Sequence, residues 1–205
     1  RNDPIIDEPT RIESADYLIV ESTYGNRLHD KTSPFQELKT TILNTAKRGG
    51  SVILPAFTVG RAQTVLYYIH QLKSKGVIPD IPVFVDSPMA TKVTHLLDHY
   101  IGEHRLTKKQ CKEITETASY ISTIEESKQI DNYVMPMIII SASGMATGGR
   151  VLHHLKAFAS DQRNTILFTG FQAGGTRGAR MLNGETEIKI HGKMVPIHAK
   201  VENLT

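Results

Sequence analysis

Short apolar runs bounded by turn residues recur along the chain, and longer amphipathic segments separate them. The runs predict five strands: 17–21 (YLIVE), 51–56 (SVILPA), 81–86 (IPVFVD), 136–141 (PMIIIS) and 165–170 (TILFTG). The segments between them carry apolar residues at spacings of three and four, which predict crossover helices, as in 64–76 (TVLYYIHQLKSKG) and 150–160 (RVLHHLKAFAS).

This alternation predicts an α/β fold with a Rossmann-like parallel sheet flanked by helices. Parallel strands need long crossover connections, and those connections cover both faces of the sheet. Two regions depart from the pattern. Residues 100–133 are polar and helix-prone, and they predict a pair of surface helices inserted before the strand at 136–141. Residues 186–204 hold two β-rich runs about Gly192 and predict an antiparallel hairpin.

Composition narrows the class of protein further. The chain has 205 residues, of which 40% are hydrophobic, so it can bury a sizeable core. It contains no run of eighteen apolar residues and no signal-peptide pattern, and we expect a cytoplasmic location. The net charge of +3 permits a polyanionic partner without requiring one. The first residue is Arg1 rather than Met, and we expect the sequence to be a piece of a longer protein.

The stretch IVESTYG at 19–25 ends a predicted strand on a carboxylate. In α/β proteins the carboxyl ends of parallel strands are where ligands bind and chemistry occurs. Glu21 is therefore a candidate functional residue. An isolated acid in this position could equally be an ordinary turn or cap residue.

Four predicted strands run into loops rich in glycine and hydroxyl residues that then open a helix. Such loops let a ligand approach the backbone, and the free amides at a helix start bind anionic oxygens. The loops carry Arg61, Arg150, Arg177 and Arg180, which predict a positive groove at the edge of the sheet. A single loop of this kind is more often structural, because any strand-to-helix turn needs Gly and Ser. The phosphate-binding motifs GxxxxGK[ST] and GxGxxG are both absent, which disfavours nucleotide binding at a single site.

Histidines offer no local metal motif. His153 and His154 lie within a predicted amphipathic helix, where at most one of them faces inward, and neither HxHxDH nor HExxH occurs. We interpret these histidines as solvent-facing or packing residues. The residues thus predict no metal site.

Five stretches together resemble a known family. ADYLIVESTYGNRLH, GGSVILPAFTVGRAQTVLYYI, IPVFVDSPMATKVT, SASGMATGGRVLHHL and NTILFTGFQAGGTRGARML are similar, in this order, to successive signatures of the β-CASP family of metallo-β-lactamase-fold RNA nucleases. The likeness is greatest to the branch that contains the mRNA 3′-end processing endonuclease and its bacterial and archaeal relatives. It covers nearly the whole chain.

The resemblance implies a domain plan and a chemistry. In that family a β-CASP domain is inserted within a metallo-β-lactamase domain, and RNA reaches a two-zinc centre in the cleft between them. Two metal ions suit phosphodiester hydrolysis because they activate water and stabilise both the attacking and the leaving oxygen. By this reading residues 1–24 are an end piece of the metallo-β-lactamase domain, 25–185 are the β-CASP domain, and 186–205 are a hairpin returning to the first domain. Glu21 matches the family's first β-CASP acid, which pairs with a histidine from a later motif.

Departures from the family pattern shape the functional prediction. The family's HxHxDH motif, its aspartate metal ligand and its SAH histidine are all missing here. We therefore expect two zinc ions in the parent protein but none bound by this chain, and we expect the chain alone to be folded and inactive.

The resulting hypothesis is that the chain is the RNA-binding portion of a zinc-dependent ribonuclease. Single-stranded RNA is the expected partner, and a homodimer is left open. Loop chemistry suggests a set of phosphate-contacting residues: Arg61, Ser143, Gly144, Arg150, Thr176 and Arg177. Two alternatives from other classes stay open, namely a module that binds a nucleotide or sugar phosphate and a non-catalytic scaffold subunit.

Overall fold

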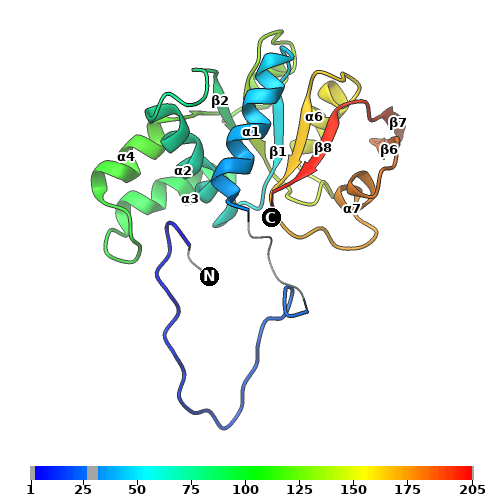
Figure 1. Cartoon of the computed structure of the whole chain (residues 1–205). Helices are drawn as coiled ribbons and strands as arrows, with labels where there is room; N and C mark the ends of the chain where they lie inside the picture. The colour runs from blue at the N-terminus through cyan, green and yellow to red at the C-terminus, as the bar shows by residue number, and fades with distance from the viewer. Residues whose placement is uncertain (1–2, 27–31, 205) are drawn as a thin grey trace.

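A six-stranded parallel sheet forms the centre of the structure, a computed structural model that describes residues 3–26 and 32–204 (Figure 1). The strands lie in the order β3-β2-β4-β1-β5-β8. Their bounds are β1 Val52–Pro55, β2 Val83–Asp86, β3 Ser119–Tyr120, β4 Ile138–Ser141, β5 Thr165–Phe168 and β8 Lys200–Asn203. Every pair of neighbours runs parallel, which confirms the predicted fold class.

Helices connect the strands as the periodicity predicts. Several begin where the sequence supplies a cap: Ser87 accepts a hydrogen bond from the Ala90 amide with Pro88 at the first position, and Thr107 forms a reciprocal capping box with Gln110. The helices are α1 Pro34–Lys47, α2 Arg61–Ser74, α3 Pro88–His99, α4 Lys108–Glu116, α5 Ile124–Ile130, α6 Val151–Phe158 and α7 Arg177–Leu182. Of these, α4 and α5 confirm the helical insertion predicted within 100–133.

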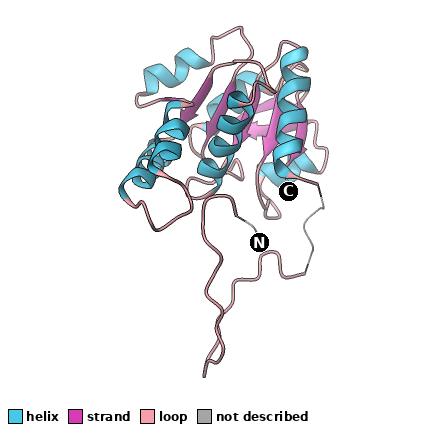
Figure 2. Cartoon of the chain, turned by 60° about the vertical axis from the view of Figure 1, so that its left-hand side comes forward, coloured by secondary structure: helices cyan, strands magenta, loops and turns pink. Residues whose placement is uncertain are grey.

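Two hydrophobic clusters lie on opposite faces of the sheet. Val52 and Leu54 belong to one cluster, with side chains from α1 to α4, whereas Ile53 belongs to the other, with α6, α7 and the hairpin at 187–196. All four residues of β1 are buried, as expected for a central strand covered on both sides (Figure 2). This double coverage explains why the central strands read as continuous apolar runs.

The C-terminal region combines a hairpin with a sheet strand. Strands β6 (Glu187–Ile190) and β7 (Lys193–Pro196) pair antiparallel, and the two residues between them, His191 and Gly192, both have positive φ, as in a type I′ turn. The predicted hairpin is confirmed. The run after it departs from the prediction, because β8 joins the main sheet beside β5. The assignment of 186–205 to a second domain stays a prediction.

Residues 3–26 contain no helix or strand, so the strand predicted at 17–21 is wrong. The side chains of Tyr17, Leu18, Ile19 and Val20 are 65–99% exposed. A strand needs a partner, and no described strand pairs with these residues. The segment hangs from one side of the sheet as a long loop (Figures 1 and 2). Near its start Ile5 is buried and accepts a hydrogen bond from the Arg105 amide.

None of the helices in the described ranges is both long and apolar enough to cross a membrane.

Candidate functional site

Three loops meet at the carboxyl edge of the sheet because they follow three adjacent strands. Strands β4, β1 and β5 are neighbours, and the loops after them contact one another. The Gln172 side chain, from the loop after β5, donates to the Gly144 carbonyl in the loop after β4 at 2.9 Å. The Ala56 amide after β1 donates to Ser141 at 3.0 Å. The predicted convergence of the strand-end loops is therefore correct for these three strands.

Phe57 lies where these loops meet. Its ring packs against Gly144 and Gly170, and a Cβ atom added to Gly144 would lie 2.7 Å from the ring. Glycine is needed at 144 because only a residue without a side chain allows this approach. Even so, Phe57 is 39% exposed, so the ring is fixed on one side and open to solvent on the other.

The segment that carries Glu21 reaches the same place. Tyr24 packs edge-on against Phe171, with ring centroids 6.2 Å apart, and its hydroxyl accepts a hydrogen bond of 2.9 Å from the Phe171 amide. The result is a pocket of about 510 Å³, which we call the Phe57 pocket. It is lined by Glu21, Thr23, Tyr24, Phe57, Val59, Arg61, Met145, Gly170, Phe171 and Ala173.

Glu21 lines this pocket although it does not end a strand. Its carboxylate is fully exposed and accepts a hydrogen bond from the Thr23 amide. Hydrogen bonds from the Thr23 side chain and backbone hold the pKa of Glu21 below its ordinary value. The carboxylate is thus ionised at neutral pH and able to accept a proton or a hydrogen bond.

The hydroxyl groups of Ser143 and Thr176, which were predicted to contact RNA, form hydrogen bonds within the protein. Ser143 Oγ contacts the Thr147 hydroxyl and accepts from the Thr147 amide, both at 3.1 Å. Thr176 caps α7 by accepting from the Ala179 amide, and it donates to the Ala173 carbonyl at 2.7 Å. These residues shape their loops, and their predicted contacts with RNA are not tested by the structure.

The arginines expected to form a positive groove make contacts within the protein. Arg177 donates to the carbonyls of Lys189, Ala146 and Thr147, and Arg180 pairs with Glu185. The third, Arg150, turns inward to Asp86. These contacts leave the positive groove, and the contacts of Arg150 and Arg177 with RNA, as predictions. Arg61 is the one of the four that lines the Phe57 pocket.

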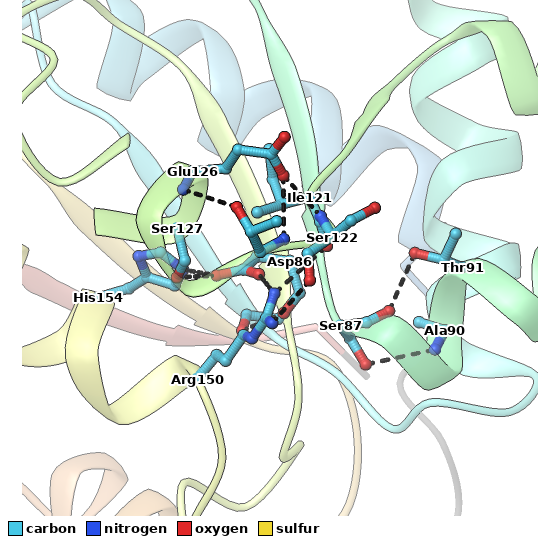
Figure 3. Close-up of polar contacts among 12 residues, drawn as sticks. Asp86, Ser87, Ala90, Thr91, Ile121, Ser122, Glu126, Ser127, Arg150 and His154 are labelled. Atoms are coloured by element: carbon cyan, nitrogen blue, oxygen red, sulfur yellow. Dashed lines mark hydrogen bonds and ion pairs between the residues drawn. The ribbon is translucent and has the colours of Figure 1, made fainter. Parts of the chain in front are cut away.

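A buried polar network surrounds Asp86 at the end of β2 (Figure 3). Arg150 lies 2.6 Å from Asp86 Oδ1, His154 Nε2 lies 2.8 Å from Oδ2, and the Ser127 hydroxyl also donates to Oδ2. Arg150 reaches further, to the carbonyls of Ile121 and Ser122 at 3.3 and 3.1 Å. The network therefore ties β2 to α5, to α6 and to the loop that follows β4.

Ionisation in this network follows from its hydrogen bonds. Burial by itself would raise the pKa of Asp86, but hydrogen bonds from His154, Ser127 and Arg150 outweigh it and lower that pKa. Burial likewise would lower the pKa of His154, but hydrogen bonds to Asp131 and Asp86 raise it. The stable arrangement is a charged imidazolium between two carboxylates.

Sequence reasoning missed this network and the Phe57 pocket. Asp86 ends a strand just as Glu21 was expected to do, so the same criterion applied to VDSPMAT would have singled it out. His154 was interpreted only as a solvent-facing or packing residue; it is buried, and His153 is exposed. An aromatic residue in a strand-end loop, as in PAFTVGRAQ, was the available signal for Phe57.

Metal sites in proteins bring His, Cys, Asp or Glu side chains together. Within 3–26 and 32–204 no three such side chains are grouped so as to hold a metal ion. The two-zinc centre that the family resemblance implies for the longer protein stays a prediction, and we assign no chemical step to a metal here.

Comparisons with known proteins identify the family of the chain. The sequence model of the Beta-Casp domain matches residues 62–181. Ribonuclease TTHA0252 from Thermus thermophilus is 33% identical, over 100% of this chain and 48% of that protein. The RNase J-like protein of Methanocaldococcus jannaschii is 34% identical, over 94% of this chain and 46% of that protein. Transcription termination factor FttA of Methanosarcina mazei is 35% identical, over 93% of this chain and 31% of that protein.

The chain thus spans about half the length of these relatives or less. The matched domain covers more than half of the chain and includes β2, β4, α6, β5 and all of α2 but its first residue, whereas β1 and the loop with Phe57 precede it. On these grounds the chain belongs to the β-CASP family.

Proposed function

We propose that the chain is the RNA-binding portion of a ribonuclease that hydrolyses RNA phosphodiester bonds. The observation that carries the proposal is the Phe57 pocket, which places an ionised carboxylate, Glu21, and a guanidinium, Arg61, beside aromatic side chains at the carboxyl edge of a parallel sheet. Aromatic faces and a cation are what proteins use to bind single-stranded RNA. The names of two relatives, a ribonuclease and an RNase J-like protein, support the same substrate class.

Arg61 is the proposed contact for a backbone phosphate. It begins α2, so it lies at the positive end of that helix's dipole, which adds to the positive potential. Ser143, Gly144 and Thr176 act in this proposal by shaping the loops around the pocket.

Glu21 is the proposed catalytic carboxylate. Its low pKa keeps it charged, which suits a group that orients or stabilises a protonated partner near the scissile phosphate. We propose that this partner is a histidine of the longer protein. Two zinc ions are proposed for that longer protein as well, held by residues other than those described here.

Nuclease assays on the longer protein test the role of Glu21. We expect Glu21→Gln to lower the rate of RNA cleavage about 100-fold or more, the range found for loss of a positioned acid–base group. Glu13→Gln is the matched control, since Glu13 is an exposed acid on the same loop that does not line the pocket. Equal activity of the two variants would contradict a catalytic role for Glu21.

A further inference from the structure

The Phe57 pocket is larger and more apolar than contact with a phosphate requires. Besides Glu21, Thr23 and Arg61, its walls are apolar or aromatic, with Tyr24, Phe57 and Phe171 supplying three rings. We propose that this pocket holds one unpaired nucleobase of the bound RNA strand, stacked on Phe57. This inference rests on the proposed function, because it names the subsite that an RNA strand would occupy.

The ring of Phe57 is held along one edge. Its Cδ2 and Cε2 atoms lie against Gly144 and Gly170, where no side chain keeps the ring at a distance, and added Cβ atoms would lie 2.7 and 3.4 Å from them. A ring fixed in this way loses little freedom when a base stacks on it, so most of the stacking energy goes into binding. Its 39% exposure leaves area for that contact.

Tyr24 and Phe171 supply the other two rings of the pocket lining. Their edge-on contact and the hydrogen bond from the Phe171 amide to the Tyr24 hydroxyl fix both rings relative to each other. The pocket volume of about 510 Å³ lies within the range of roughly 300–1,000 Å³ that is usual for sites that take small organic groups. The space therefore suits a single base and its sugar.

Charge around the pocket favours a neutral base over a phosphate as the occupant. Glu21 is ionised and would repel a phosphate placed among the rings, whereas Arg61 attracts one at the wall that it lines. A nucleotide can satisfy both residues if its base lies on Phe57 and its phosphate lies toward Arg61. Stacking on an aromatic ring is tolerant of sequence, so we expect little preference among the four bases.

Binding of short RNAs with a single abasic residue at each position in turn tests this subsite on the unaltered chain. An abasic nucleotide keeps its phosphate, so it removes only the stacked base. We expect one position at which affinity falls roughly 5- to 100-fold, with the salt dependence of binding unchanged. A uniform small loss at every position would overturn the pocket assignment while leaving the proposed RNA binding intact.

Substitutions at Phe57 provide a second test. Phe57→Leu keeps an apolar contact with the two glycines but removes the aromatic face, and Phe57→Tyr keeps that face. We expect Leu to reproduce the abasic loss, Tyr to bind like the unaltered chain, and the abasic effect to vanish in the Leu variant. An undiminished abasic effect in Phe57→Leu would overturn the inference. Failure of the unaltered chain to bind any single-stranded RNA would instead overturn the proposed function, and the inference with it.

Discussion

His154 Nε2 lies 2.8 Å from the carboxylate of Asp86, and both side chains are completely buried. The other ring nitrogen, Nδ1, lies 2.6 Å from Asp131. Since each nitrogen faces a carboxylate, the imidazolium form satisfies both contacts, and the pKa of His154 is raised in spite of burial. The pair joins α6 to β2 beneath the loop that carries Ser143 and Gly144. Its integrity is therefore a condition for the shape of the candidate site.

Removing His154 should destabilise the domain strongly. His154→Ala leaves Asp86 buried with one cationic partner fewer, and breaking a buried ion pair costs about 3–5 kcal/mol. Urea denaturation followed by circular dichroism measures this loss as a shift of the midpoint. His153→Ala, at the exposed neighbouring position, should change the midpoint little. Equal shifts of the midpoint for the two variants would show that the buried His154–Asp86 pair adds no stability beyond that of an exposed histidine.

Stability should depend on pH through the same pair. The folded-state pKa of His154 is raised, so its contribution is fully present below the ordinary value of 6.5 and is lost as pH rises through the raised pKa. The pKa of Asp86 is lowered, so its contribution is present above the ordinary value of 3.8 and is lost as pH falls through the lowered pKa. Denaturation midpoints measured from acid to alkaline pH should therefore fall at both ends of the range, giving an acid limb due to Asp86 and an alkaline limb due to His154.

His154→Gln separates the two limbs. Glutamine does not titrate, so the loss of stability as pH rises above neutrality should flatten in this variant, while the acid limb remains. An alkaline limb of unchanged slope would assign that pH dependence to other groups.

Arg150→Ala should lower stability as well as any RNA affinity. A residue that only contacted phosphate, as the loop chemistry suggests for Arg150, would weaken RNA binding without unfolding when replaced. The structure has Arg150 paired with Asp86 at 2.6 Å, with only 22% of its side chain exposed. We expect a loss of about 3 kcal/mol in the free energy of unfolding. Arg180→Ala is the control, because the Arg180–Glu185 pair is exposed and should contribute little. A folded, fully stable Arg150→Ala variant with weak RNA binding would restore the original prediction.

Gly144→Ala should disturb the packing of the Phe57 ring. The new Cβ would lie 2.7 Å from the ring and 2.8 Å from the Phe57 backbone nitrogen, so the loop after β1 must shift. Overpacking of this kind costs about 1–3 kcal/mol. Gly148→Ala, in the same loop, meets no atom within 4 Å and should be tolerated. Thermal denaturation of both variants compares them directly, and equal melting points would contradict a tight fit at position 144.

Much of the fold was predictable because buried strands and amphipathic helices leave local patterns. The central strands β1, β4 and β5 are buried at every position and mostly apolar, because both their faces are covered. The run at 17–21 has the same composition, yet it forms no strand here. Pairing depends on a neighbouring strand, and an apolar run carries no information about whether one is present.

The candidate site was only partly predictable. Convergence of the strand-end loops follows from parallel topology, and Glu21 and Arg61 do reach one pocket. The partner of each arginine could not be read from sequence, because Asp86 and Arg150 are 64 positions apart and their contact arises from the placement of β2 next to β4. Arginines that the sequence suggests as anion-binding groups thus form hydrogen bonds and ion pairs within the protein.

We propose that single-stranded RNA binds at the carboxyl edge of this sheet, with Arg61 and the Phe57 pocket as its contacts. Affinity for a short unstructured RNA should be measured over a series of salt concentrations. We predict that log affinity falls linearly with log salt and that Arg61→Ala weakens binding and reduces the slope by about one. Binding that does not depend on salt, or a slope that Arg61→Ala leaves unchanged, would contradict RNA binding at this surface.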